Sequence, residues 1–352
     1  MPKITIVGTT SWGITLGVAL SRKDFPVCLW ARSEKEAARI RNVRQATRIL
    51  PTGFRLPPYL TVSSSLAEAM DGAKAVIMAV PSQAMRENIK LVAPFLSKSV
   101  LVANAAKGLE IGSGLRMSQV IAEEIDPAFW YNICVISGPN IAWEILNGLP
   151  AMTVVAAEKK SVARKAQKML TAPNFCAYTN TDVIGVELGG ALKNIIALGA
   201  GIADGLEYGD NAKSALVTRG LTEITALGAA LGANPLTFAG LAGLGDLIVT
   251  CSSHLSRNHY VGVELTKGRS LKEITDSMEN VAEGVTTTSV AWNLAQGLEL
   301  EMPITQRIYQ VLYEGANIQA AAVELMADTA RHELAGRKWK LFSFFRKRRK
   351  KP

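Results

Sequence analysis

The sequence predicts an α/β fold in which a parallel sheet with helices on both faces is followed by a mostly α-helical second domain. Short runs rich in β-forming residues alternate with helix-like segments through the first half of the chain, as in a parallel sheet flanked by helices. After Thr181 the strand signals stop, and apolar residues recur at helical spacing. A length of 352 residues also gives each of two domains enough chain for a core of its own.

The strand-like runs define the expected order of the first domain. They are residues 3–7, 27–31, 75–80, 99–103, 133–137 and 152–157. The pattern changes near residues 178–182. We therefore expect two domains, 1–180 and 181–336, followed by a basic tail at 337–352.

The charge of the chain is concentrated in that tail. The whole sequence has 39 Lys and Arg against 30 Asp and Glu, a net charge of +9. The segment 337–352 alone holds nine basic and no acidic residues, so 9 − 9 leaves residues 1–336 formally neutral. A nucleic-acid-binding surface over the folded body is therefore not expected. The tail is either a solvated disordered segment or a weak attachment to an anionic membrane surface.

Cysteine and histidine usage indicates neither disulfides nor a metal site. The four cysteines are scattered without a CxxC pair, which is typical of reduced thiols in a cytosolic protein. His254 and His259 have no nearby ligand pattern for a metal. The chain also runs directly into a short strand, so no signal peptide is expected and the predicted location is cytoplasmic.

The first strand leads into a glycine-containing turn and then a helix, which is the dinucleotide-binding arrangement of a Rossmann-like domain. Gly8 permits the tight turn, Gly13 allows close packing of helix on sheet, and the helix N-terminus offers free N–H groups to a pyrophosphate. Thr10 stands where the fingerprint has its middle glycine. A generic strand–turn–helix remains an alternative for this loop.

Arg32 ends the second strand, 24 residues after Gly8. A site that prefers NAD usually has an acid at this place for the ribose hydroxyl, whereas an arginine can bind a 2′-phosphate. The sequence therefore favours NADP over NAD. The alternative is an ordinary surface arginine, and Glu34 nearby weakens the case for NADP.

Lys193 lies in the middle of residues 183–203, which are apolar almost all round and predict a buried helix. Glu187, Lys193 and Asn194 argue against a membrane span. A buried lysine needs a partner, and Asp246 is the obvious candidate. If burial lowers its pKa toward neutral pH, Lys193 can carry a proton in catalysis. A lysine that reaches solvent along a helix surface is the alternative.

Residues 237–262 surround a single carboxylate, Asp246, with small and apolar side chains. A lone acid in such surroundings is costly unless a cation meets it. Ten positions later, Ser256, Arg257 and Asn258 form a compact set of hydrogen-bond donors suited to a phosphate. A glycine-rich turn with a structural ion pair is the alternative interpretation of this segment.

Several ordered segments resemble the NAD(P)-dependent glycerol-3-phosphate dehydrogenase family, from the first strand to about residue 330. They are SWG at 11–13, VPS at 80–82, AAKGLE at 105–110, SGPNIAWE at 137–144, GALKN at 190–194, DGLEYGDNAKSALVTRGLTE at 204–223, GLAGLGDL at 240–247, SSHLSRN at 252–258 and VAEGVTT at 281–287. The resemblance implies reversible hydride transfer between a nicotinamide cofactor and the dihydroxyacetone phosphate/sn-glycerol 3-phosphate pair, for glycerophospholipid synthesis.

The resemblance also implies roles for matching residues. Lys193 would give a proton to the ketone oxygen in reduction and take it back in oxidation, and Asp246 would orient it. The implied substrate-binding residues are Lys107, Gly138, Asn140, Lys193, Asp246, Ser256, Arg257 and Asn258. The implied cofactor-binding residues are Ser11, Trp12, Arg32, Lys107, Ala142, Arg257, Val281 and Glu283, together with Gly8 and Gly13 of the loop.

Two departures from the family pattern bear on these expectations. Thr10 replaces a glycine and puts cofactor affinity in doubt, and Asn140 stands where many members have Ser or Thr. A non-catalytic nucleotide-sensing or scaffold protein is therefore the alternative from a different class, and a related hydroxy-acid reductase is the alternative enzyme. The sequence does not set the oligomeric state, and a homodimer is kept as a candidate assembly.

Overall fold

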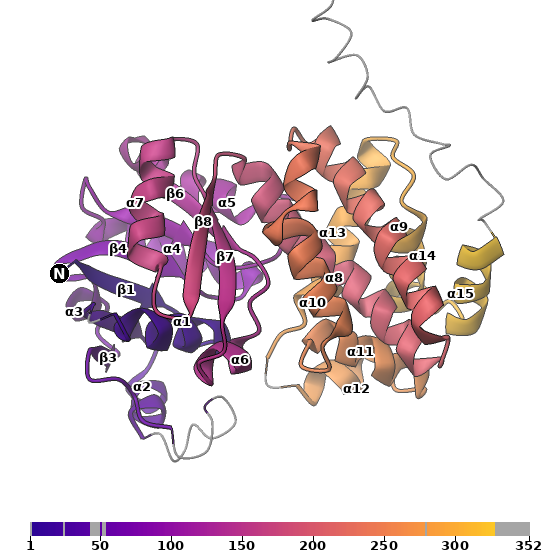
Figure 1. Cartoon of the computed structure of the whole chain (residues 1–352), viewed down its shortest axis with the longest axis horizontal. Coiled ribbons are helices and arrows are strands. Elements are labelled where there is room, and N and C mark those ends of the chain that lie inside the picture. The colour runs from indigo at the N-terminus through magenta and orange to yellow at the C-terminus, as the bar shows by residue number, and fades with distance from the viewer. Residues whose placement is uncertain (1, 24, 43–49, 51–53, 279, 328–352) are drawn as a thin grey trace, which may run out of the picture.

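The computed structural model describes residues 2–23, 25–42, 50, 54–278 and 280–327. A sheet flanked by helices forms one side of the molecule, and a bundle of helices forms the other (Figure 1). The basic tail expected at 337–352 lies outside the described residues.

The first part of the chain is built on an eight-stranded sheet with the order β3-β2-β1-β4-β5-β6-β7-β8. Its strands are β1 Lys3–Val7, β2 Val27–Trp30, β3 Leu60–Ser63, β4 Ala73–Met78, β5 Leu101–Asn104, β6 Ile133–Ser137, β7 Ala151–Ala156 and β8 Phe175–Asn180. The six predicted strands are confirmed. The two edge strands, β3 and β8, were not predicted, because LTVS and FCAYTN carry polar residues and few aliphatic ones.

The expectation of a parallel sheet is wrong at one place. β6 and β7 pair antiparallel, with Ser137 opposite Val154, whereas the other neighbouring strands are parallel. A parallel crossover needs a connection long enough to return along the sheet, usually through a full helix. The connection between β6 and β7 contains only the five-residue helix α6, Ala142–Leu146, and the chain turns back instead.

Helices cover both faces of the sheet, as predicted. They are α1 Ser11–Ser21, α2 Glu34–Arg41, α3 Leu66–Met70, α4 Met85–Val92, α5 Met117–Glu124, α6 and α7 Lys160–Leu170. Consecutive residues of β1 enter different cores: Ile6 packs with Ile14 and Leu16 of α1, and Val7 packs with Met85 and Ile89 of α4. This alternation follows from the two-residue period of a strand.

Every described regular element after β8 is a helix. The main ones are α8 Val183–Gly205, α9 Gly209–Ala230, α10 Asp246–Ser252, α11 Arg257–Thr266, α12 Leu271–Asp276, α13 Glu283–Gly297, α14 Pro303–Tyr313 and α15 Ile318–Ala327. Short helical turns also occur in both parts of the chain. Before β8 they are η1 Ser82–Ala84, η2 Ala93–Phe95 and η3 Pro127–Asn132, and after it they are η4 Pro235–Ala239 and η5 Leu241–Gly245. This change of architecture after Asn180 is our reason for proposing domains 1–180 and 181–336.

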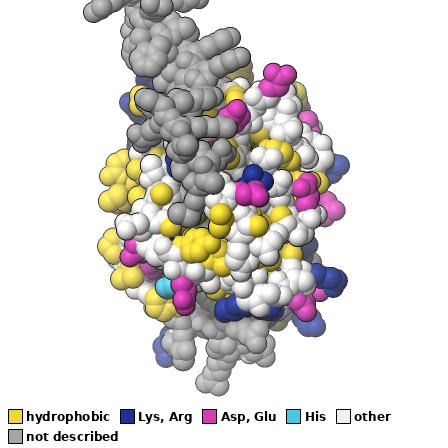
Figure 2. All heavy atoms as spheres, turned by 90° about the vertical axis from the view of Figure 1, so that its right-hand side faces the viewer, with side chains coloured by type: hydrophobic (Ala, Val, Ile, Leu, Met, Phe, Trp, Pro, Cys, Tyr) yellow, Lys and Arg dark blue, Asp and Glu magenta, His cyan; other side chains and the backbone are white. Residues whose placement is uncertain are grey.

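Helix α8 is the central element of the helical part. It is 23 residues long and apolar enough to cross a membrane by length and composition, but 89% of its most apolar window is buried inside the protein. Helices α9, α10, α11 and α13 all pack against it. Figure 2 shows the end of the molecule formed by this bundle, where basic and acidic side chains are interspersed on the visible surface.

Candidate active site

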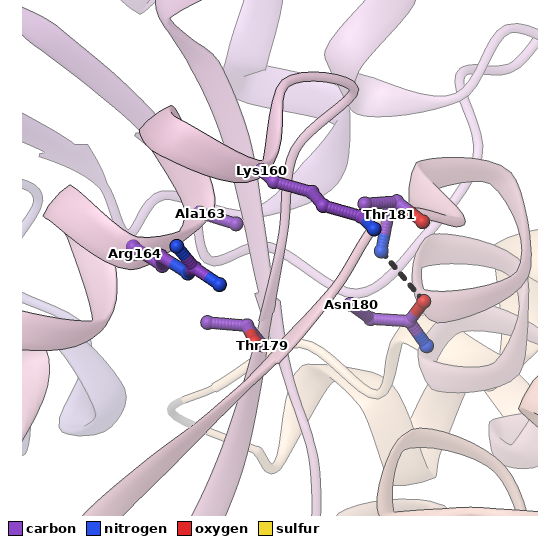
Figure 3. Close-up of a pocket in the computed structure, with 6 residues that line it drawn as sticks. All are labelled: Lys160, Ala163, Arg164, Thr179, Asn180 and Thr181. Atoms are coloured by element: carbon purple, nitrogen blue, oxygen red, sulfur yellow. Dashed lines mark hydrogen bonds between the residues drawn. The ribbon is translucent and has the colours of Figure 1, made fainter.

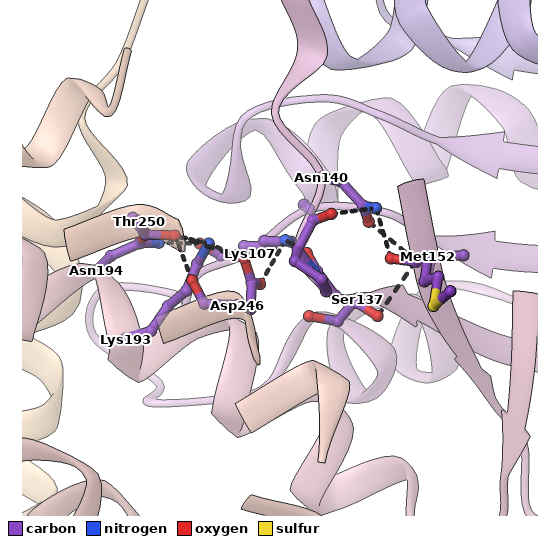
Figure 4. A network of polar contacts seen from close by, with 12 residues as sticks. Lys107, Ser137, Asn140, Met152, Lys193, Asn194, Asp246 and Thr250 are labelled. Carbon is purple, nitrogen blue, oxygen red and sulfur yellow. Dashed lines mark hydrogen bonds and ion pairs between the residues drawn. The ribbon is translucent and has the colours of Figure 1, made fainter. Parts of the chain in front are cut away.

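Lys193 lies inside the protein and contacts the carboxylate predicted for it. The residue is 6% exposed, which excludes the alternative of a lysine that reaches solvent. Its Nζ forms an ion pair with Asp246 Oδ1 and lies 2.6 Å from Thr250 Oγ1 (Figure 4). Asp246 is the first residue of α10 and is 1% exposed. Thr250 follows one helical turn later and donates to the Asp246 carbonyl, at 2.6 Å.

A second lysine reaches the same carboxylate from the sheet. Lys107 lies just beyond β5, and its Nζ is 2.6 Å from Asp246 Oδ2 and 2.9 Å from the carbonyl oxygen of Gly138. The two oxygens of Asp246 thus bind two ammonium groups, one from each part of the chain. Two cations and one anion leave this cluster with a surplus positive charge, which suits an anionic ligand.

The environment of Lys193 adjusts its acidity. Burial lowers the pKa of Lys193 from its ordinary value of 10.5 to about 8, the charge of Asp246 opposes this change, and the charge of Lys107 adds to it. Burial acts in this direction because a low-dielectric interior disfavours the charged amine. An amine with such a pKa can both give and take a proton near neutral pH.

Glycines allow α10 to approach α8 closely enough for this contact. A Cβ on Gly189 of α8 would lie 2.5 Å from the carbonyl oxygen of Ala242, and a Cβ on Gly243 would lie 2.1 Å from that of Phe238. No side chain fits at such distances, so Gly189 lets η5 lie against α8 and Gly243 lets η5 lie against η4. The glycine-rich run of the sequence therefore brings Asp246 to Lys193.

The predicted phosphate donors lie at the start of α11. Ser256 caps this helix, since its Oγ accepts from His259 N at 3.3 Å. Arg257 is exposed, and its Nη1 donates to the carbonyl of Val281 at 2.7 Å. Asn258 is buried, and its amide bonds Asn194 Oδ1 and Gly284 N, each at 2.9 Å. The structure brings the three residues together, but Asn258 is engaged by protein partners.

Gly138 and Asn140 lie at the end of β6. Gly138 has φ +154°, and a Cβ there would lie 3.0 Å from Thr153 Cα. The amide of Asn140 is held by β7, because its Nδ2 donates to Met152 O at 2.9 Å and its Oδ1 accepts from Thr153 Oγ1 at 2.9 Å (Figure 4). Ala142 begins α6. The roles expected of these residues toward ligands stay predictions.

The loop after β1 has the form expected for binding a dinucleotide. Gly8 has φ +110°, and a Cβ there would lie 2.6 Å from Ala79 O; a Cβ on Gly13 would lie 2.3 Å from Gly8 O. The first turn of a helix lacks intrahelical acceptors for its N–H groups. In α1 the described residues provide no acceptor for the N–H groups of Ser11 and Trp12. These two donors at a helix N-terminus fit a pyrophosphate.

Thr10 is accommodated in this loop without strain. Its φ of −63° needs no glycine, and its Oγ1 accepts from Gly13 N at 3.1 Å while donating to Ala79 O at 2.7 Å. The hydroxyl therefore caps α1 and ties the loop to Ala79, directly after β4. The N-cap role was not foreseen, although Thr followed by a helical run is one of its usual signals.

Two residues near this loop were expected to bind the cofactor. One of them is packed inside the protein, and the other is exposed. The Trp12 ring packs edge-on against Phe175, with centroids 6.3 Å apart, and its Nε1 is buried without a hydrogen-bond partner among the described residues. Arg32 is exposed at the end of β2. Glu36, which sequence reasoning missed, accepts from the Arg32 backbone N–H at 3.2 Å and from the hydroxyl of Thr9.

Glu283 connects the two parts of the chain. It begins α13, and its carboxylate accepts from the backbone N–H of Ser82 at 2.9 Å and from the Ser82 hydroxyl. Burial raises the pKa of Glu283, and the bonds from Ser82 oppose this change. Val281, two residues earlier, is 47% exposed. Both residues were expected to bind the cofactor, and the observed partner of Glu283 is Ser82.

Two neighbours of Lys193 were missed as site residues. Thr250 could have been found from its place four residues after Asp246, because helical residues at that spacing share a face. Asn194 directly follows Lys193, and its Nδ2 donates to the carbonyl of Lys107 at 3.3 Å. Among the residues that the structure describes, no group of His, Cys, Asp or Glu is arranged to hold a metal ion.

A pocket of about 310 Å³ lies elsewhere, between the start of α7 and the end of β8 (Figure 3). Its lining residues are Lys160, Ala163, Arg164, Thr179, Asn180 and Thr181. It shares no residue with the lysine cluster at Asp246.

Comparisons with known proteins show to which family this chain belongs. The models of the NAD-dependent glycerol-3-phosphate dehydrogenase N-terminus and C-terminus match residues 3–163 and 182–323. A relative from Dehalococcoides mccartyi, named glycerol-3-phosphate dehydrogenase (NAD(P)+), is 66% identical over 349 residues, covering 99% of this chain and 97% of its own. One of the same name from Geobacter metallireducens is 45% identical over 331 residues, covering 94% and 98%.

Solved structures give the same result. The crystal structure of glycerol-3-phosphate dehydrogenase from Coxiella burnetii matches with a TM-score of 0.86 at 35% identity, covering 92% of this chain and 98% of that one. The match includes both the sheet and the helical bundle. The chain therefore belongs to the NAD-dependent glycerol-3-phosphate dehydrogenase family.

Proposed function

We propose that this protein is an NAD(P)-dependent glycerol-3-phosphate dehydrogenase that interconverts dihydroxyacetone phosphate and sn-glycerol 3-phosphate. The observation that carries the proposal is the convergence of Lys107 and Lys193 on the Asp246 carboxylate. When bound, the nicotinamide supplies or accepts the hydride; the protein supplies position, charge and a proton.

In the direction of reduction, Lys193 Nζ donates a proton to the ketone oxygen as negative charge develops there. Asp246 and Thr250 hold the ammonium group in place, each through an oxygen in contact with Nζ. Lys107 adds a second positive charge near the developing alkoxide, which stabilises it most where water is excluded. In oxidation, the neutral Lys193 amine takes the proton back.

The substrate phosphate is assigned to the start of α11. Within the described part of the chain, Arg257 is held by a hydrogen bond from Nη1 to the Val281 carbonyl, so the rest of the guanidinium can bind an anion. Ser256 and Asn258 lie on either side of it in the sequence. For the dinucleotide, the N–H groups of Ser11 and Trp12 would bind the pyrophosphate, with Gly8 and Gly13 fixing the loop.

The test is oxidation of NADPH or NADH on addition of dihydroxyacetone phosphate, measured for the parent protein and for Lys193→Met. We expect turnover in the parent protein and its loss in the variant, since methionine fills most of the same space but has no amine to transfer a proton. Cofactor binding, followed by the fluorescence of the reduced nicotinamide, serves as control and is expected to persist. A parent protein that binds cofactor but turns nothing over would contradict the proposal.

The alternative of a non-catalytic sensing protein rests mainly on Thr10, which here caps α1, and no comparison supports it. Membership of the family does not determine the finer features of the proposed function. We propose that the product serves glycerophospholipid synthesis, that the enzyme is cytoplasmic, and that NADP is preferred through Arg32. A homodimer remains a candidate assembly, and a membrane role for 337–352 concerns residues outside the described structure.

A further inference from the structure

Glu187 is a buried carboxylate on α8 that the proposed chemistry does not use. It is 3% exposed, and its two oxygens accept four hydrogen bonds. The donors are Asn104 Nδ2 at 3.0 Å, Ser118 N at 2.7 Å, Ser118 Oγ at 2.6 Å and Arg116 Nη1 at 2.8 Å. A buried carboxylate is tolerated only when it is satisfied in this way.

Glu187 binds residues of two structural elements, α5 and β5, which lie differently with respect to the active site. Ser118 and Arg116 belong to the start of α5, where a carboxylate is stabilised by the free N–H groups of the helix. Asn104 ends β5, three residues before Lys107, and is fully buried. The contact with Asn104 reaches the residues directly before Lys107, whereas Arg116 pairs with Leu109, two residues after it.

Asn104 uses its amide to fix the backbone of the residue before Lys107. Its Oδ1 accepts from Ala106 N at 2.9 Å, and its Nδ2 donates to Ala106 O at 3.3 Å as well as to Glu187. The Glu187 carboxylate selects this orientation of the amide, because it can only accept a hydrogen bond and therefore requires the NH₂ end.

Three positions on one face of α8 hold this loop. Glu187, Gly190 and Asn194 have the i, i+3, i+7 spacing of a single helical face. Glu187 binds Asn104 before the loop, and Asn194 donates to the Lys107 carbonyl at 3.3 Å. Between them, a Cβ on Gly190 would lie 3.5 Å from Lys107 Cγ and 2.2 Å from Ser137 Oγ. The helix that carries Lys193 is thus also the surface on which the Lys107 loop rests.

We propose that Glu187 is a positioning residue for catalysis: through Asn104 it sets the backbone of residues 104–107 and thereby the place of Lys107 Nζ relative to Asp246 and Lys193. The proposal deepens the proposed function and rests on it. Glu187 itself touches none of the groups assigned to the reaction, so its effect reaches them through Asn104 and the loop.

A displaced Lys107 has a consequence that a merely structural defect lacks. The charged or titratable groups that act on Lys193 are Asp246 and Cys251 of α10, which favour its charged form, and Lys107, which disfavours it. When Lys107 moves away, the pKa of Lys193 rises. Because reduction needs protonated Lys193, the alkaline limb of the kcat profile then moves to higher pH.

The main comparison is between Asn104→Ala and Ser118→Ala. The first removes the link between Glu187 and the loop, and the second removes one bond to Glu187 from the α5 side only. For Asn104→Ala we expect kcat for dihydroxyacetone phosphate reduction to fall about 10-fold or more, with the alkaline limb about one pH unit higher. For Ser118→Ala we expect kcat and the limb to stay at their parental values.

A readout independent of turnover accompanies these assays. Amide hydrogen exchange in residues 104–109 is expected to accelerate in Asn104→Ala and not in Ser118→Ala, because Ala106 N–H loses its acceptor only in the former. Glu187→Ala is expected to reproduce the kinetic effect of Asn104→Ala, because it removes the Oε1 acceptor that Asn104 Nδ2 uses. Its matched control is Glu223→Ala, which removes a buried carboxylate that caps α14 through Ile304 N at 2.7 Å.

The outcomes separate this inference from the proposed function. Turnover in the parent protein with an unchanged kcat and limb in Asn104→Ala would overturn the inference alone. An equal shift of the limb in Ser118→Ala or Glu223→Ala would also overturn it, since general destabilisation would then explain the effect. A parent protein without turnover would remove the proposed function, and the inference with it.

Discussion

At the scale of single residues, the central feature is a lysine whose charge is both disfavoured and supported. Burial and Lys107 act against the charged form of Lys193, and Asp246 acts for it, with burial the larger effect. Two charged side chains would be expected to pair in so apolar an environment, and they do. The balance between the effects determines how stability depends on pH.

We predict that Lys193 makes folding stability rise between about pH 8 and 10.5. In this window the unfolded chain holds a proton that the folded protein has released, so the free energy of unfolding increases with pH. The cost of charging the buried amine is fully present below this window. Urea unfolding of the parent protein and of Lys193→Met at pH 7 and pH 10 measures the difference. From pH 7 to pH 10, the free energy of unfolding of the parent protein should increase by on the order of 3 kcal/mol relative to that of the variant. Equal pH dependences in the two proteins would show that Lys193 has an ordinary lysine pKa.

Cofactor preference is also set at this scale. The Glu36 carboxylate lies against the glycine-containing loop through Thr9 and the Arg32 backbone, and a negative charge there disfavours an additional phosphate. We expect Glu36→Gln to improve NADPH binding relative to NADH by about two- to fivefold, and Arg32→Ala to worsen it, as for partly exposed charges. Fluorescence titrations with both nucleotides test this. Unchanged ratios in both variants would mean that neither side chain selects the cofactor.

At the scale of elements, the approach of η5 to α8 depends on missing side chains. We predict that Gly189→Ala costs about 1–3 kcal/mol in unfolding free energy, because its Cβ would lie 2.5 Å from a backbone oxygen that cannot move freely. The same displacement shifts Asp246 and lowers kcat. Thermal unfolding and steady-state kinetics measure the two effects.

Gly297→Ala is the matched control for this substitution. Gly297 ends α13, has no positive φ, and a Cβ added to it would meet nothing within 4 Å. We expect this change to be neutral or slightly stabilising, since alanine restricts the unfolded chain. Equal destabilisation by both substitutions would show that helix propensity, and not the contact with η5, governs the result.

The elements also show how far sequence reasoning reaches. Strands rich in Val and Ile, such as β4 and β6, are evident from composition, whereas β8, with the sequence FCAYTN, exists because a neighbouring strand offers hydrogen bonds. The pairing of Lys193 with Asp246 could be predicted because each is a lone charge among apolar residues. The orientations of the Thr10 and Asn140 side chains could not, because they depend on β4 and β7, which are distant in the sequence.

At the scale of the whole molecule, the sheet and the helical bundle meet through charged contacts. Asp246 binds Lys107 from beyond β5, and Glu283 binds Ser82 from beyond β4. These contacts hold side chains from both parts of the chain around one site. The two parts are therefore expected to unfold together.

We predict that Asp246→Asn weakens this coupling. The amide leaves the buried Lys193 ammonium and the partly buried Lys107 ammonium near each other without a counter-charge, a change that typically costs about 3–5 kcal/mol. Calorimetry should show one transition for the parent protein and a lower, broader or divided one for the variant. A variant that melts like the parent protein would mean that the carboxylate does not join the two parts.

Because a single carboxylate serves two amines, the energies of Lys107 and Lys193 are not independent. When one amine is removed, Asp246 pairs with the other amine alone, and that remaining ion pair becomes stronger. The losses of stability in the two single substitutions therefore sum to less than the loss when both amines are removed. A double-mutant cycle on the two lysines should therefore give a coupling energy of clear magnitude instead of simple additivity.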